Sequence, residues 1–171
     1  DKFVTAKKTL GTQMKATGEV MSIARTFEAA LHKSLHSLEE NKESLLLDAF
    51  MEMSTEEVHE ALYNVDNLRV YSIAVAIYKG IQLEEIHDIT KIDEWFIEKL
   101  RNLADYEAEI ANGLTDELYL KGKKYGYTDV AIERISGSKI ENPRDAVYKM
   151  VDTCAAEYKA LTPYFYSTYD N

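Results

Sequence analysis

The residue types best suited to catalysis are a single cysteine and a few histidines and carboxylates. Cys154 lies in the stretch VYKMVDTCAAEY, between Asp152 and Glu157. A nucleophilic thiol needs a lowered pKa, which a nearby base, cation or helix amino end supplies. Both neighbouring acids would raise that pKa, and two alanines follow directly. We therefore expect Cys154 to be a small packed side chain rather than a nucleophile.

Two histidines, His32 and His36, lie four residues apart, a spacing that lets two imidazoles on one helix bind the same metal. A zinc site takes three or four protein ligands, and the chain's other two histidines lie far away in the sequence. Lysine rather than glutamate follows His32, so the HExxH motif is not completed. We expect the pair to lie in exposed positions beside an apolar stripe and to bind no metal.

The carboxylates form no convincing pair. The motif EEIH places Glu84 three residues before His87, but a ferritin-like di-iron site needs this motif on two helices and no second copy occurs. The glycines never cluster into a phosphate-binding loop. Trp95 and Phe96 are interpreted as core anchors of a long helix. No catalytic, cofactor-binding or metal-binding residue is therefore predicted in this chain.

Composition narrows the classes of partner. The 171 residues carry a net charge of −10, which disfavours nucleic acid and anionic membranes as partners. One cysteine cannot form an internal disulfide, and no apolar run has the length of a membrane span. The start shows neither an initiator methionine nor a signal-peptide core, which fits an excised fragment. We expect a cytoplasmic protein.

The middle of the chain predicts helices from their start and stop signals. Expected amino-terminal caps are Thr26, Ser54 with Glu57 as a capping box, Asp66 or Asn67, Thr90 with Asp93, Thr115 and Thr128. The segment VYSIAVAIY is apolar nearly all round, as in a central buried helix. The longest helix is expected to end near Ala111. These patterns predict an all-α fold, an irregular multi-helix domain with short extended segments at both ends.

The two ends of the chain lack a helical period. The segment GEVMSIAR (18–25) indicates a short strand or extended piece, and residues 137–145 indicate a loop. The stretch from residue 147 onward favours short strands, with five aromatic residues between positions 158 and 169. An aromatic-rich tail of this kind is expected to pack against another part of the protein.

Three stretches, in this order and spacing, resemble the large subunit of carbamoyl phosphate synthetase: TQMKATGEVMSIARTFEAALHKSLHSLE (12–39), ITKIDEWFIEKL (89–100) and VYKMVDTCAAEYKALTPYFYSTY (147–169). The segment DNLRVYSIAVAIYKG, with Arg69 in the place of a usual arginine, resembles the buried helix of that family's oligomerisation domain. The resemblance covers essentially the whole chain. It departs at Ala24, where the family usually has glycine, and at the 137–145 loop, which is too short for a helix that the family often carries.

The resemblance implies three parts: the tail end of an ATP-grasp domain (1–25), a helical oligomerisation domain (26–146), and an extended docking segment leading to the second synthetase half (147–171). The parent would be a ligase of arginine or pyrimidine biosynthesis. It would make carbamoyl phosphate from bicarbonate, glutamine-derived ammonia and two ATP, with magnesium. Expected partners are the remaining domains of the large subunit, the small glutaminase subunit and further copies of itself.

None of the family's catalytic, nucleotide-binding or metal-binding residues maps onto a position in this chain. The resemblance therefore implies a non-catalytic segment that supplies shape and contact surface to a larger enzyme. Two alternatives stay open at this point: a free-standing helical protein-interaction module, and an enzyme that uses His32 and His36 with a metal.

Overall fold

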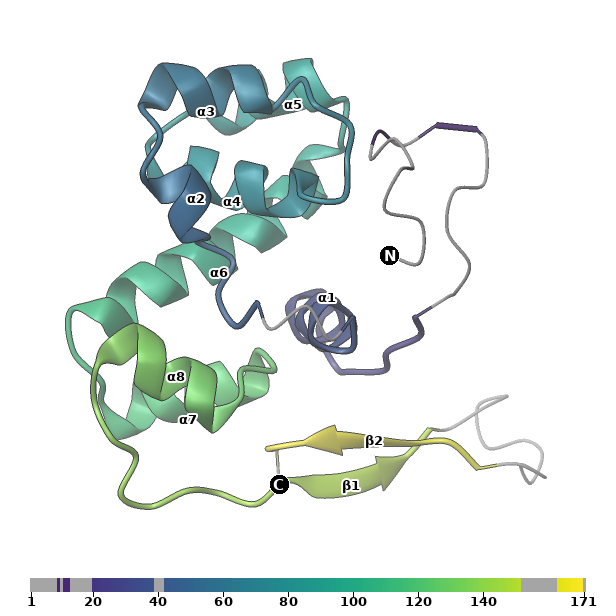
Figure 1. Cartoon of the computed structure of the whole chain (residues 1–171). Coiled ribbons are helices and arrows are strands. Elements are labelled where there is room, and N and C mark those ends of the chain that lie inside the picture. Colours follow the sequence, from purple (N-terminus) through teal and green to yellow (C-terminus); the bar gives the residue numbers. More distant parts are fainter. Residues whose placement is uncertain (1–8, 10, 13–19, 39–41, 152–162, 171) are drawn as a thin grey trace.

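A computed structural model describes residues 9, 11–12, 20–38, 42–151 and 163–170 (Figure 1). Within these residues the helices are α1 (Phe27–His36), α2 (Asp48–Met51), α3 (Thr55–Ala61), α4 (Arg69–Tyr78), α5 (Leu83–Thr90), α6 (Glu94–Ala111), α7 (Asp116–Lys124) and α8 (Asp129–Ser136). Two short strands, β1 (Val147–Met150) and β2 (Phe165–Thr168), follow them. The prediction of a mostly helical fold is confirmed. No described helix is long and apolar enough to cross a membrane.

The long helix α6 organises the domain. It packs against α1, α4, α5 and α8, and it runs diagonally between the group α2–α5 and the pair α7 and α8 (Figure 1). Helix α4 lies beneath α3 and α5, and residues 71–77 are all buried, as the all-round apolar pattern predicts. The main hydrophobic core thus lies where α4 and α6 meet.

Most helix starts follow their predicted caps. The hydroxyls of Thr26, Thr115 and Thr128 each accept a hydrogen bond from the backbone N–H three residues later. Ser54 and Glu57 form the complete capping box, with Ser54 N–H donating to the Glu57 carboxylate at 2.8 Å. These contacts are local, so the sequence alone determines them.

Two predicted helix starts are wrong. Thr90 does not open the long helix, because it is the last residue of α5 and its hydroxyl donates to the Ile86 carbonyl. Asp93 alone caps α6 and accepts from Trp95 N–H at 2.9 Å. Asp66 accepts from the N–H of Leu68, and Leu68 itself is the N-cap of α4. The aspartate therefore forms a local turn just before the helix instead of capping it.

Trp95 and Phe96 are not core anchors, so the sequence-based expectation for these two residues is wrong. Their side chains are 48% and 43% exposed. The buried face of α6 runs instead through Ile97, Leu100, Leu103, Ala104, Tyr106, Glu107 and Ile110. The buried face of α6 therefore begins at Ile97 rather than at Phe96.

A buried carboxylate holds the segment before α2 against the rest of the domain. Glu107 is 1% exposed and accepts from the Leu45 N–H at 2.8 Å and the Tyr127 hydroxyl at 2.8 Å. Ser44 Oγ donates to the same carboxylate, and Leu46 N–H does so at 3.3 Å. Burial raises the pKa of Glu107, and these hydrogen bonds oppose that rise. Three separate parts of the chain therefore meet at one side chain.

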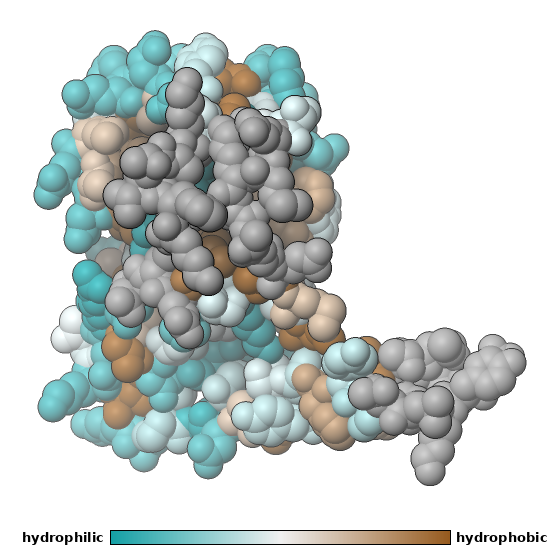
Figure 2. Space-filling model, turned by 45° about the vertical axis from the view of Figure 1, so that its right-hand side comes forward, coloured by the Kyte–Doolittle hydropathy of each residue, from teal (hydrophilic) through white to brown (hydrophobic). Residues whose placement is uncertain are grey.

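Strands β1 and β2 form an antiparallel pair that extends from the helical body as a narrow arm (Figure 2). Directly opposed residues share a face, so Tyr148, Met150 and Phe165 lie together, with Met150 opposite Phe165. All three are exposed, whereas Thr168 on the other face is buried. The extended segment predicted after residue 147 is confirmed for the described residues. Residues 20–24 form no strand. Of the two structures predicted for this segment, a short strand or an extended piece, only the extended piece remains.

Candidate functional site

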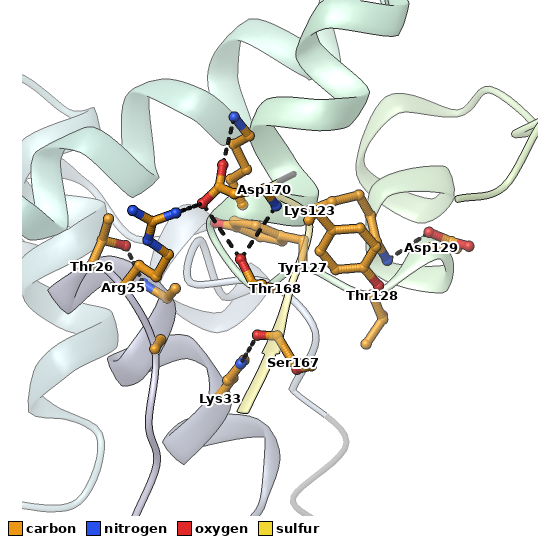
Figure 3. A pocket seen from close by; sticks show the side chains of 15 residues that line it. Arg25, Thr26, Lys33, Lys123, Tyr127, Thr128, Asp129, Ser167, Thr168 and Asp170 are labelled. Carbon is orange, nitrogen blue, oxygen red and sulfur yellow. Dashed lines mark hydrogen bonds and ion pairs between the residues drawn. The ribbon is translucent and has the colours of Figure 1, made fainter. Parts of the chain in front are cut away.

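A pocket of about 470 Å³ lies where the chain enters and leaves the helical domain. Its walls come from the segment before α1, from α1 itself, from the turn between α7 and α8, and from the end of β2 (Figure 3). Four cationic side chains line it, namely Arg25, Lys33, Lys123 and Lys124. The only acids among its lining residues are Asp129 and Asp170. This is a local excess of positive charge in a chain whose net charge is −10.

Asp170 is the centre of the pocket's ion pairs. Its carboxylate accepts from Lys124 Nζ at 2.8 Å and from Arg25 Nη1 at 3.2 Å (Figure 3). The Lys124 ammonium, with Arg25 adding to it, holds the pKa of Asp170 below its usual value. Because Arg25 precedes α1 and Lys124 ends α7, Asp170, two residues after the end of β2, is tied to both helices.

Lys33 forms a second connection between the same elements. Its ammonium donates to the Ser167 carbonyl of β2 at 2.8 Å and to the Ile23 carbonyl at 3.3 Å. Burial lowers the pKa of Lys33. A lysine with a lowered pKa can serve as a nucleophile or base. Here its ammonium is held between two carbonyl acceptors, so the arrangement suits a structural contact. Arg25, Lys33, Lys124, Ser167 and Asp170 are called the junction below.

Ion pairing also holds the side of the pocket that is formed by the end of α7 and the turn between α7 and α8. Lys123 is 7% exposed, donates to Asp129 at 2.7 Å, and lies 5.0 Å from the centre of the Tyr169 ring. Gly126, in the turn between α7 and α8, has φ of 90°, and a Cβ there would lie 3.3 Å from the Ala29 carbonyl oxygen. Glycine is therefore required for α1 to approach this turn.

The charged side chains of the pocket are bound to partners within the protein. Every cation of the pocket has an acidic or carbonyl partner, and the lining residues contain no histidine or cysteine. Among the described residues, no group of three or more His, Cys, Asp or Glu side chains is placed to hold a metal. The pocket is best described as the seam that joins the incoming segment, the helices and the β arm.

The histidine pair is separated by its surroundings. His32 is buried, not exposed as expected, and its ring lies 4.0 Å from that of Tyr127. Burial lowers the pKa of His32 to about 4. His36 is exposed, as predicted. With one imidazole in the core and the other in solvent, the two do not form a metal site together.

The other candidates take part in local contacts. The imidazole Nδ1 of His87 donates to the Ile92 carbonyl at 2.7 Å, and Glu85 pairs with His59 at 2.9 Å, so the EEIH motif stabilises helix ends. Cys154 lies outside the described residues, and its assignment stays a prediction. The junction residues were not singled out from the sequence. Arg25 and Asp170 are 145 positions apart, and nothing in either neighbourhood signals the pairing.

Comparison with known proteins identifies the family. The family described as "Carbamoyl-phosphate synthetase large chain, oligomerisation domain" matches residues 19–151. The carbamoyl phosphate synthase large chain of Lachnoclostridium phytofermentans is 46% identical over 181 aligned residues, which include 100% of this chain and 17% of that protein. The corresponding proteins of Caldanaerobacter subterraneus and Archaeoglobus fulgidus are 45% and 41% identical, over 99% and 100% of this chain.

The chain spans only 17–18% of the length of these relatives. Identity at this level extends across the helical domain and through both strands of the β arm. The chain belongs to the carbamoyl-phosphate synthetase large-chain family, as its oligomerisation domain.

Proposed function

We propose that this chain is a non-catalytic oligomerisation and linker segment of a glutamine-dependent carbamoyl phosphate synthetase. The parent is a cytoplasmic ligase that makes carbamoyl phosphate from bicarbonate, glutamine-derived ammonia and two ATP, with magnesium at its ATP sites. Its other partners are the remaining domains of the large subunit, the small glutaminase subunit and further copies of the enzyme. Two findings support this assignment. The chain belongs to the family, and its whole length aligns with a small part of much longer relatives.

The contacts of the junction are the main support for the linker role. Asp170 bonds Arg25 and Lys124, and Ser167 bonds Lys33, so the chain enters and leaves the helical domain at one place. Sequence on either side of the domain is thereby held at a fixed separation and orientation. A domain that served only to fill space between its neighbours would not need contacts between its two ends.

The proposed parts are 1–25 as the tail end of an ATP-grasp domain, 26–146 as the helical domain and 147–171 as a docking segment. The family match stops at residue 151, so it includes β1 and excludes β2. A single two-stranded hairpin is marginally stable in water, and the exposed face with Tyr148, Met150 and Phe165 leaves apolar surface uncovered. Both features support docking of the arm onto the next part of the large chain.

Activity measurements on the 171-residue chain test the non-catalytic role. The purified chain, with its helices verified by circular dichroism, should neither hydrolyse ATP nor make carbamoyl phosphate. Either activity in the isolated chain would refute the proposal.

Charge reversal in the complete large chain tests the linker role. Asp170→Arg places a third cation between Arg25 and Lys124 and should separate the junction. We expect ATP hydrolysis to continue while more ATP is consumed for each carbamoyl phosphate made, because the two halves are no longer held in register. Asp88→Arg is the matched control, since Asp88 is 76% exposed and pairs only with Lys91 among the described residues. Equal coupling in both variants would contradict the linker role.

The alternative of a free-standing interaction module is not favoured. Each relative cited above carries this sequence as a small part of a much longer chain that is a carbamoyl phosphate synthase. A metal enzyme based on His32 and His36 is also not favoured, because only one of the two side chains reaches solvent.

A further inference from the structure

The pocket at the junction carries a surplus of positive charge. Four cationic side chains line it, against two carboxylates. One lysine–aspartate pair is balanced, but the Asp170 carboxylate is shared by Arg25 and Lys124. Within the described part of the chain, the Lys33 ammonium contacts only backbone carbonyl oxygens, which carry no formal charge. Two positive charges in this pocket are therefore not balanced by its lining residues.

The same three cations keep hydrogen-bond donors that no described residue uses. A guanidinium offers five N–H donors and an ammonium offers three. Arg25 and Lys124 each donate one bond, both to Asp170, and Lys33 donates two. Acceptors in the pocket are in shorter supply, because each oxygen of the Asp170 carboxylate already accepts from a cation. The pocket is therefore suited to a ligand that accepts hydrogen bonds.

Two helices begin at the same cavity. Thr26 is the N-cap of α1 and Thr128 is the N-cap of α8, and both line the pocket (Figure 3). Each hydroxyl oxygen accepts from a backbone N–H of its own helix, and its hydrogen can still donate to a ligand. The amino end of a helix carries partial positive charge and favours anions. Both helix starts therefore add to the positive charge of the lysines and the arginine.

We propose that this pocket binds a small dianion of the phosphate type, either inorganic phosphate or the phosphate group of a small monoester. Such a ligand matches the two unbalanced positive charges, and its oxygens accept from the unused donors of Arg25, Lys33 and Lys124. The cavity volume of about 470 Å³ lies within the range of small-molecule sites, roughly 300–1,000 Å³. The site is built from residues of this chain, so the inference does not rest on the proposed function.

A bound dianion stabilises the closed junction. Arg25 and Lys33 belong to the segment before α1 and to α1 itself, and Lys124 ends α7. A ligand that contacts all three adds a bridge between elements that Asp170 already joins, and its binding shifts the equilibrium toward the closed arrangement. The side chains of Arg25 and Lys124 are 53% and 46% exposed, so solvent screens their charges and half-saturation is expected at about 1–10 mM phosphate.

Lysine acetylation measured by peptide mass spectrometry tests the site, because it reports each lysine separately in the complete large chain. The acetylation rate of Lys124 is compared in phosphate, in methyl phosphate and in chloride at equal ionic strength. Lys91 is the reference, since its side chain is 74% exposed, pairs with Asp88 and does not line the pocket. At about 20 mM of either phosphate compound, we expect the rate at Lys124 to fall about threefold or more relative to Lys91. Protection by both compounds assigns the phosphate group as the ligand, and protection by inorganic phosphate alone assigns the free ion.

Substitutions in the pocket test the ligand contacts. Arg25→Gln removes one cation and should abolish the protection of Lys124, whereas Arg25→Lys keeps the charge and should retain most of it. Arg101→Gln is the matched control, because the Arg101 side chain is 44% exposed and pairs with Glu98 on α6. Asp170→Asn removes a negative charge from the pocket and should lower the half-saturating phosphate concentration about fivefold to tenfold. An ion-pair cluster that bound no ligand would show no response to phosphate in this variant.

The same measurements on the 171-residue chain, with its helices verified by circular dichroism, separate this pocket from phosphate sites elsewhere in the large chain. Equal acetylation of Lys124 in phosphate and in chloride would overturn the proposal. Protection that survives Arg25→Gln, or weaker phosphate binding in Asp170→Asn, would also overturn it. The linker role is judged by a different measurement, the ATP consumed for each product in Asp170→Arg. Absence of phosphate binding together with impaired coupling would therefore refute only the anion site.

Discussion

Replacing Glu107 by alanine should destabilise the helical domain more than any change at its exposed neighbours. The carboxylate is the only acceptor among the described residues for the Leu45 N–H and the Tyr127 hydroxyl. Each buried donor left without an acceptor costs about 1–3 kcal/mol, and the space left by the side chain adds to this. Relief of the cost of burying a carboxylate offsets part of the loss. We expect Glu107→Ala to lower the free energy of unfolding by about 3 kcal/mol.

The isosteric change Glu107→Gln separates shape from hydrogen bonding. One amide oxygen can still accept from Leu45 and Tyr127, but the amide nitrogen would face the Leu46 N–H, which is also a donor. The expected loss is therefore smaller, about 1–2 kcal/mol. Leu46 keeps a second acceptor in Ser44 Oγ at 3.0 Å, which limits the cost.

Urea unfolding followed by circular dichroism measures both variants against Glu109→Ala. Glu109 lies two residues further along α6, has a side chain that is 51% exposed, and pairs with Lys121 at 2.8 Å. An exposed pair of this kind contributes about 0.2–1 kcal/mol. If Glu107→Ala and Glu109→Ala destabilised the chain equally, the account of the buried carboxylate would be wrong.

Two further predictions concern the packing of α1, α6 and α7. Burial lowers the pKa of His32 from 6.5 to about 4. The contribution of this residue to stability is therefore fully present above pH 6.5, and it is lost as the pH falls from 6.5 toward 4. His32→Leu should remove about 3 kcal/mol of this acid sensitivity in urea unfolding at several pH values, and His36→Leu should not. Gly122→Ala would place a Cβ against the Tyr106 hydroxyl and should lower the melting temperature despite the better helix propensity of alanine, whereas Gly11→Ala, with open space around it, should change it little.

The sequence predicted features that depend on a few adjacent residues. The caps at Thr26, Ser54, Thr115 and Thr128 bond within three residues of themselves, so no tertiary contact decides them. The buried helix α4 was also predicted, because an apolar pattern all round a helix admits only one environment. In these places local chemistry and the final fold agree.

The inner face of α6 was mispredicted because its true pattern includes a charged residue. Trp95 and Phe96 were expected in the core, yet both are nearly half exposed. The real face continues from Ile97 through Glu107, which a hydrophobic pattern rejects. Burial of that carboxylate depends on donors from residues 44–46 and from Tyr127, which come from distant parts of the chain.

His32 and the junction show the same limit. The environment of His32 depends on Tyr127, 95 positions later, and the pairing of Asp170 depends on Arg25, 145 positions earlier. No period or motif links such residues in a single sequence. The family resemblance, which rests on long stretches of sequence, assigned the two ends of this chain to two separate parts that flank the helical domain, and it did not indicate their pairing.

The contacts of the junction are individually weak and act together. Its two ion pairs are partly exposed, and each contributes about 0.2–1 kcal/mol, with a similar amount from the bond of Lys33 to Ser167. Together they favour the closed junction by about 2 kcal/mol, which corresponds to a ratio of about thirty to one. Three contacts from different directions fix the orientation of β2, because a single contact would leave it free to rotate.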